Sequence, residues 1–232
     1  CGVQISHYAE VSFDGMQSLI DSVGGIDINA TDDVDDPEHL DIKITAGQQH
    51  MDGATALTYA RCRYIYADGD YTRMRHQRQV LGALANQILN NFDPTKVFDL
   101  VNSLSDMLVT DMSVQDIVST VNAMRGMDVD GMYSANLPSY ADETTVIDGQ
   151  SYVFVYEDEL KEMMARVDAG KDPKGPNTMG LSDGSSSTIG DLNENTSDDY
   201  AYGTATSSTG SDDSGDSGDG SDYYEEPTGD GN

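Results

Sequence analysis

Arginine is concentrated in one short stretch of this 232-residue chain: five of its seven arginines lie between positions 61 and 78. They are Arg61, Arg63, Arg73, Arg75 and Arg78. Several planar guanidinium groups near one point match a ligand that carries many anionic oxygens, such as phosphate or pyrophosphate. The segment therefore predicts an anion-binding site.

The rest of the chain is strongly acidic. Twelve Lys and Arg face 42 Asp and Glu, which gives a formal net charge of −30. Residues 61–78 contain only two acidic residues, Asp68 and Asp70, so this segment is +3 and the remainder −33. Such a surface repels nucleic acid and anionic membranes. A second interpretation stays open at this point: the arginines lie on a solvated helix face and pair with some of the many carboxylates.

Two helices are predicted to position the arginines. Residues 47–61 form a turn and then a helix, so Arg61 and Arg63 lie at its end. Residues 71–91 form a long helix on which Arg73 and Gln77, four residues apart, share a face that His76 flanks. Asp70 lies between the helices, where it is an N-cap, a metal ligand or a partner that orients an arginine.

Strands and helices are mixed along the chain, which predicts an α/β or α+β fold. Strands are predicted at 3–11, 26–28, 42–44, 129–137 and 152–155. Further helices are predicted at 13–23, 94–108, 113–125 and 157–167. Asp93 is the predicted N-cap of the second of these, and Ser113 with Asp116 resembles a capping box at the start of the third. The acidic stretch 31–41 is predicted to be a solvated loop, since it lacks the glycine and ligand spacing of a calcium-binding loop.

Composition divides the chain near position 170. Residues 1–169 are long enough to form a core. Residues 171–232 carry 14 acidic and 2 basic residues and only three Val, Ile or Leu, so 170–232 is predicted to be an acidic disordered tail rich in Gly, Ser and Asp. Cys1 and Cys62 do not make a disulfide framework. Two separate buried thiols are predicted, with a single Cys1–Cys62 pair in an oxidising compartment as the alternative.

Several linked motifs in order closely resemble the LytR-CpsA-Psr family. They are VGGI at 23–26, GQQHMDGATALTYARCR at 47–63, DGDYTR at 68–73, Gln77, TDMS at 110–113 and LP at 137–138. The resemblance covers residues 1 to about 165. It implies an α/β domain with a central mixed β-sheet flanked by helices, here truncated at its N-terminus.

The resemblance also implies a function. Members are phosphotransferases that attach an anionic glycopolymer, such as wall teichoic acid or capsular polysaccharide, from a polyprenyl-pyrophosphate carrier to peptidoglycan, with Mg²⁺. They act on the outer face of the bacterial cytoplasmic membrane. By position, Arg61, Arg63, Arg73 and Gln77 bind the pyrophosphate, with Arg75 and Arg78 as possible additions. Asp70 and Arg73 fall on catalytic positions.

Two departures from the family pattern qualify this prediction. His76 stands where the family usually has arginine. The sequence also starts at what would be a middle strand, so the metal-binding aspartate, further arginines and the membrane anchor are expected in a preceding part, and the 232 residues alone are expected to be inactive. The alternative is a non-catalytic extracellular module that binds an anionic polymer or a lipid pyrophosphate.

Overall fold

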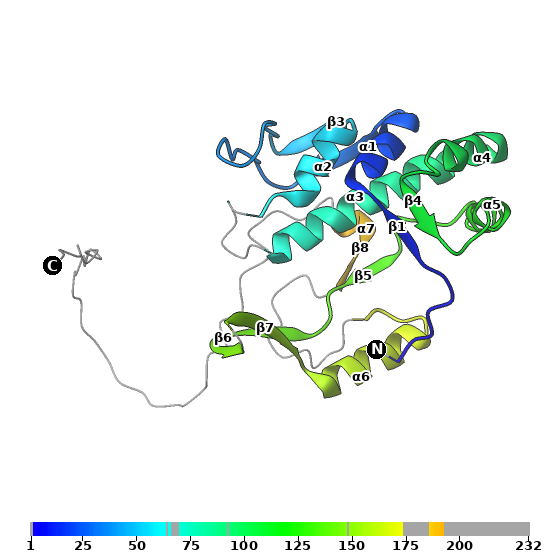
Figure 1. Cartoon of the computed structure of the whole chain (residues 1–232). Coiled ribbons are helices and arrows are strands. Elements are labelled where there is room, and N and C mark those ends of the chain that lie inside the picture. The colour runs from blue at the N-terminus through cyan, green and yellow to red at the C-terminus, as the bar shows by residue number, and fades with distance from the viewer. Residues whose placement is uncertain are drawn as a thin grey trace, which may run out of the picture.

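The computed structural model describes residues 2–63, 65, 70–91, 93–147, 149–173 and 186–192. Helices and strands are mixed throughout, which confirms the predicted α/β class (Figure 1). The first half contains β1 (Ala9–Val11), α1 (Phe13–Ser22), β2 (Ile26–Ala30), β3 (Gly47–Met51), α2 (Gly53–Arg61), α3 (Asp70–Asn90) and α4 (Pro94–Ser103). The second half contains β4 (Leu108–Thr110), α5 (Val114–Ala123), β5 (Tyr133–Ala135), β6 (Ser139–Ile147), β7 (Gln150–Val155), α6 (Glu157–Asp168), β8 (Ser186–Thr188) and α7 (Ile189–Leu192).

The main hydrophobic core joins α1, α2 and α3 to the hairpin of β2 and β3. Alternate residues of β2 point inward, as expected for a strand with one buried face: Ile26, Ile28 and Ala30 are buried and Asp27 is exposed. From the helices come Ile20, Tyr59 and Val80 among others. This core holds the two arginine-bearing helices against one hairpin.

The two helices α1 and α2 approach each other closely because α2 begins with a glycine. A Cβ at Gly53 would lie 2.3 Å from the Gln17 carbonyl oxygen of α1, well inside van der Waals contact. The Gly53 N–H donates to Asp21 Oδ1 at 2.7 Å, so the start of α2 is tied to the last turn of α1. Small size at position 53 therefore sets the helix spacing.

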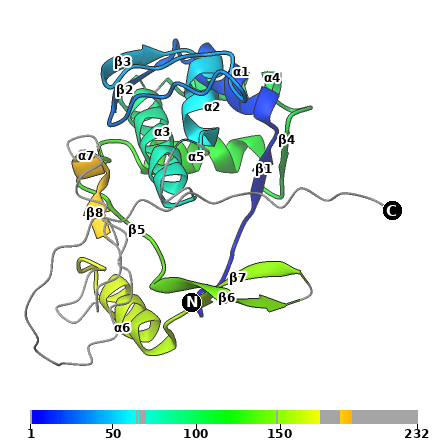
Figure 2. The same ribbon diagram turned by 90° about the vertical axis from the view of Figure 1, so that its left-hand side faces the viewer.

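The strands of the described residues form four two-stranded antiparallel sheets, whose pairs are β1–β4, β2–β3, β5–β8 and β6–β7. Within the described ranges no larger sheet is present, so the central mixed sheet that the resemblance implies does not appear there. Figures 1 and 2 show the β6–β7 hairpin and α6 at the end of the molecule opposite α1 and α2. The predicted strand at 3–11 is shortened to β1, because only Ala9 to Val11 find a partner strand.

Local signals set several element ends. Asp93 caps α4 by accepting from Thr95 N at 2.9 Å, as predicted, but α4 ends at Ser103, before the predicted end near Leu108, and β4 begins at Leu108. The Ser113–Asp116 capping box is present at the start of α5, which confirms that prediction. Strand β6 was not predicted, since its sequence, SYADETTVI, is interrupted by acidic residues.

Part of the predicted disordered tail is ordered. Residues 186–192 form β8, which pairs with β5, and α7, in which Ile189 and Leu192 are buried against Val129. Ile189 and Leu192 are two of the three Val, Ile or Leu residues between positions 171 and 232. Composition averaged over these 62 positions did not predict that two apolar residues so close together would be buried. The remaining tail residues after 173 lie outside the described part, and their predicted disorder stays a prediction.

Across the described residues, no helix combines the length and the apolar character that a membrane span requires.

Candidate functional site

The arginines lie on two helices whose ends meet. Helix α2 is capped at its start by Asp52, which accepts from Thr55 N at 2.9 Å, and ends at Arg61, where a cation complements the helix dipole. Helix α3 carries Arg73, Arg75 and Arg78 within its first three turns. The side chains of Arg61 and Arg63 are exposed, and those of Arg73 and Arg78 are half-buried.

Side chains of α3 hold the end of α2. His76 Nδ1 lies 3.2 Å from the Tyr59 carbonyl oxygen, and Gln77 Nε2 donates to the Ala60 carbonyl at 3.3 Å. These carbonyls belong to the last turn of α2, where the helix itself provides no N–H groups to bond them. Gln77 therefore lies next to Arg61 in space, and the face of α3 that it shares with Arg73 is directed toward the end of α2.

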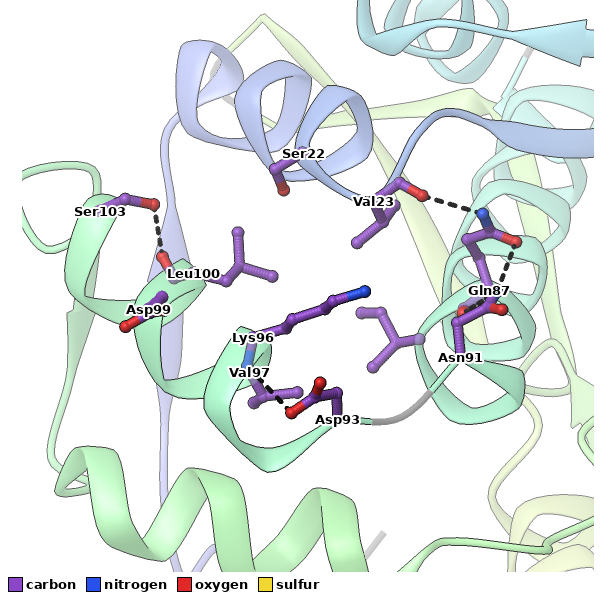
Figure 3. A pocket seen from close by; sticks show the side chains of 11 residues that line it. Ser22, Val23, Gln87, Asn91, Asp93, Lys96, Val97, Asp99, Leu100 and Ser103 are labelled. Carbon is purple, nitrogen blue, oxygen red and sulfur yellow. Dashed lines mark hydrogen bonds between the residues drawn. The ribbon is translucent and has the colours of Figure 1, made fainter.

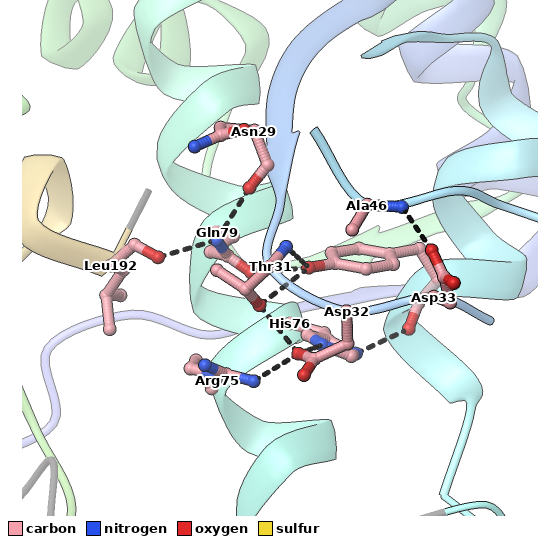
Figure 4. Close-up of polar contacts among 10 residues, drawn as sticks. Asn29, Thr31, Asp32, Asp33, Ala46, Arg75, His76, Gln79 and Leu192 are labelled. Atoms are coloured by element: carbon pink, nitrogen blue, oxygen red, sulfur yellow. Dashed lines mark hydrogen bonds and ion pairs between the residues drawn. The ribbon is translucent and has the colours of Figure 1, made fainter. Parts of the chain in front are cut away.

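A buried ionic cluster occupies another face of α3 (Figure 4). Arg75 pairs with the Asp32 carboxylate, and His76 Nε2 lies 3.3 Å from the same oxygen. Arg75 is 2% exposed and His76 is 0% exposed. Thr31 Oγ1 also donates to Asp32 at 2.7 Å. Arg75 thus lies in the protein interior, and two carboxylates depart from the solvated loop predicted at 31–41: Asp36 is buried and the Asp32 side chain is only 9% exposed.

Charge and burial act in opposite directions on the pKa values of this cluster. Burial raises the pKa of Asp32, but hydrogen bonds from His76 and Thr31 and the charge of Arg75 outweigh it and lower the pKa to about 2. Burial lowers the pKa of His76, and the contact with Asp32 opposes this effect only in part. The cluster therefore holds Arg75 as its cation and Asp32 as its anion.

A second set of hydrogen bonds joins this cluster to the core and to α7. The Tyr59 ring stacks on His76, with centroids 3.9 Å apart and 22° between the planes. Its hydroxyl donates to Gln79 Oε1 at 2.8 Å, and burial raises its pKa to about 12. Gln79 Nε2 in turn donates to the Leu192 carbonyl at 2.7 Å. Figure 4 shows these contacts around one side of α3.

Three sequence-predicted site residues, Arg61, Arg73 and Gln77, are thus brought toward the junction of α2 and α3. Arg63 is exposed just beyond α2. Asp68 and the side chain of Asp70 lie outside the described residues, as does Cys1, while Cys62 is buried. His76, which replaces the usual arginine, is directed into the interior. The role of Asp32 was missed, because its partners are 43 and 44 positions away in sequence.

A cavity of about 440 Å³ lies elsewhere, between the ends of α1 and α3 and helix α4 (Figure 3). Val23, Val97 and Leu100 contribute apolar walls, and the Lys96 side chain extends into the space between them. Its lining includes none of the arginines. We therefore treat the junction of α2 and α3 as the candidate functional site.

A metal ion finds no ready-made site among the described residues. No three His, Cys, Asp or Glu side chains in that part of the chain come close enough together to hold one. The described residues therefore do not by themselves supply the ligands for the Mg²⁺ that the resemblance implies.

Fold, motif order and the arginine-bearing helix junction together define a protein of the LytR-CpsA-Psr class. Residues 1–169 match the LytR_cpsA_psr family, and the chain belongs to this family.

Named relatives extend the comparison. Biofilm regulatory protein A of Streptococcus mutans is 30% identical over 172 residues, which cover 71% of this chain and 41% of that protein. The polyisoprenyl-teichoic acid–peptidoglycan teichoic acid transferase TagU of Enterococcus faecalis is 30% identical over 120 residues, which cover 50% and 37%. The chain thus spans less than half the length of these two relatives.

A solved structure supports the fold. The crystal structure of Bacillus subtilis TagV superposes with a TM-score of 0.57 and 24% identity, covering 68% of this chain and 61% of that one. At this identity the likeness concerns the fold alone.

Proposed function

We propose that this chain is part of a phosphotransferase that attaches an anionic glycopolymer from a polyprenyl-pyrophosphate carrier to peptidoglycan. Family membership and the transferase name of the Enterococcus faecalis relative support this class of reaction. The polymer is a wall teichoic acid, a capsular polysaccharide or a similar chain. The proposed location is the outer face of the bacterial cytoplasmic membrane.

One observation supports this function most strongly: the arginines divide into two groups. Asp32 pairs with the buried Arg75, whereas Arg61 and Arg63 are exposed and Arg73 is half-buried on the face of α3 that it shares with Gln77. In a chain with a net charge of −30, exposed arginines at one helix junction are expected to attract an anionic ligand such as a pyrophosphate. The solvated-face alternative accounts for Arg75 poorly, since that residue is buried.

The proposed roles follow from the chemistry of phosphoryl transfer. An acceptor hydroxyl forms a bond to the phosphorus that carries the polymer, the bond to the bridging oxygen breaks, and polyprenyl monophosphate leaves. Arg61, Arg63 and Arg73 bind the pyrophosphate oxygens and stabilise the charge on the leaving phosphate. Gln77 keeps the end of α2 in place through Ala60. Asp70 orients these groups or assists the acceptor hydroxyl.

The experiment is a comparison of ligands. Calorimetric titration of the 232-residue chain with farnesyl pyrophosphate, farnesyl monophosphate and inorganic pyrophosphate is expected to show that both pyrophosphates bind and that the monophosphate binds at least roughly tenfold more weakly, since it offers fewer oxygens to the guanidinium groups. Equal binding of mono- and pyrophosphate would contradict the proposed function.

Turnover separates the transferase from the alternative binding module. The chain alone is expected to release no polyprenyl monophosphate from a glycosylated polyprenyl pyrophosphate. A protein of the length of the relatives, assayed with Mg²⁺ and a peptidoglycan acceptor, is expected to release it. Binding without turnover in that longer protein would favour the module, and turnover by the 232 residues would overturn the expected inactivity.

A further inference from the structure

An aromatic ring supports one of the proposed ligand-binding arginines. The Arg61 Cζ atom lies over the ring of Phe13, 4.6 Å from its centroid. The Phe13 side chain is largely exposed, at 59%, and occupies the first position of α1. Ring and guanidinium come from different helices, so their contact depends on how α1 and α2 pack.

The packing of α1 against α2 fixes this contact. The last turn of α1 meets the first turn of α2 through the hydrogen bond from Gly53 N to Asp21, and the first residue of α1 meets the last residue of α2 through Phe13 and Arg61. The two helices are therefore antiparallel. Ser12 caps α1 by accepting from Gly15 N at 3.0 Å, which holds the helix start at Phe13 in place.

A guanidinium that lies on a ring face keeps its N–H donors near its own plane, where they remain available to oxygen atoms. The contact also restricts an otherwise flexible side chain, so less conformational freedom is lost when an anion binds. We propose that Phe13 is a positioning residue that orients Arg61 toward the pyrophosphate. This inference rests on the proposed function and adds a residue to its site.

The alternative is that Phe13 merely covers apolar surface. Leucine retains apolar bulk but lacks the electron-rich face, and tyrosine retains that face. Calorimetric titration with inorganic pyrophosphate is expected to give binding roughly two- to fivefold weaker for Phe13→Leu and near wild type for Phe13→Tyr. Tyr8→Leu is the matched control, because Tyr8 is also an exposed aromatic residue, at 55%, and it is expected to bind as wild type does.

A double-mutant cycle tests whether the effect passes through Arg61. In an Arg61→Ala background, Phe13→Leu is expected to change pyrophosphate binding no further. An equal loss in both backgrounds would overturn the inference, because it would mean that Phe13 acts independently of Arg61. Unchanged binding of Phe13→Leu in the wild-type background would overturn it as well.

A measurement without ligand separates this inference from the proposed function. The NMR signal of the Arg61 Nε–H group is expected to show a ring-current shift that Phe13→Leu removes and Phe13→Tyr retains. The absence of this shift in a chain that binds pyrophosphate overturns the inference alone. A shift in a chain that binds no pyrophosphate overturns the proposed function and, with it, the role of Phe13.

Discussion

At the scale of single residues, the Asp32 carboxylate determines which arginine of α3 is paired in the interior. Asp32 pairs with Arg75 and contacts His76, both of which are buried, so the positive charge of the cluster that remains near solvent comes from Arg61, Arg63, Arg73 and Arg78. Sequence spacing predicted the cluster of arginines but not this division. Assigning an interior partner to Arg75 requires the loop after β2, far away in sequence, to be placed against α3.

Replacement of Asp32 by asparagine is expected to lower the free energy of unfolding by roughly 3 kcal/mol, because Arg75 stays buried without this carboxylate. Chemical denaturation measures the change. Asp35→Asn is the matched control: Asp35 pairs with Lys43 on the surface, and exposed ion pairs contribute little. Equal effects of the two substitutions would contradict the role of the buried pair.

The stabilisation by Asp32 is expected to depend on pH. Its pKa is lowered in the folded protein from an ordinary 3.8 to about 2, so the folded state favours the ionised carboxylate. The stabilisation is therefore fully present above pH 3.8 and is lost as the pH falls toward 2. The difference in unfolding free energy between wild type and Asp32→Asn should narrow over this range. A difference that stays constant down to pH 2 would contradict the account.

At the scale of elements, the packing of α1 on α2 sets the position of Arg61. Much of this part was predicted from sequence: the helix at 13–23, the helix ending at Arg61, the long helix from about 71 and the Ser113 capping box all rest on local signals that the structure confirms. The partners of the strands could not be predicted in the same way, since strand pairing joins distant segments. The early end of α4 was missed for that reason, since β4, the next element, pairs with the distant β1. Strand β6 pairs with the neighbouring β7 and was missed because acidic residues interrupt its sequence.

Gly53→Ala tests the close contact of these helices. A Cβ at this position would meet the backbone of Gln17 at 2.3 Å, so α1 and α2 must separate. The free energy of unfolding is expected to fall by about 1–3 kcal/mol, as in overpacked cores. Pyrophosphate binding should weaken too, because Arg61 moves relative to Phe13. Ala54→Ser, at the next and solvent-exposed position, is the control, and an equally small effect of both substitutions would contradict the packing argument.

At the scale of the whole molecule, residues 186–192 pack against α3 although they lie beyond the region that matches the family. Residues 186–192 follow the matched residues 1–169, yet Leu192 is fully buried and its carbonyl accepts from Gln79 on α3. A Cβ at Gly82 would lie 2.3 Å from Ile189 Cγ2, so α3 accommodates this segment with a glycine. Residues 186–192 therefore contact the helix that carries three of the clustered arginines.

Leu192→Ala is expected to lower the free energy of unfolding by roughly 3 kcal/mol, because it removes a fully buried side chain from the contact with α3. Leu181→Ala provides a control in the same acidic tail, at a position where the sequence predicts disorder, and is expected to leave stability unchanged. Chemical denaturation followed by circular dichroism measures both. Similar losses, or none for Leu192→Ala, would contradict the anchoring contact.

The most direct test of the central claim is calorimetric titration with inorganic pyrophosphate of wild type, Arg61→Ala, Arg73→Ala and Arg125→Ala. Arg125 is exposed and lies outside the cluster, so it controls for loss of positive charge alone. The account predicts that the first two variants bind roughly 10- to 100-fold more weakly, as expected for the loss of a charged hydrogen-bond donor, and that Arg125→Ala binds like wild type. Equal affinity in all four proteins, or an equal loss in all three variants, would contradict it.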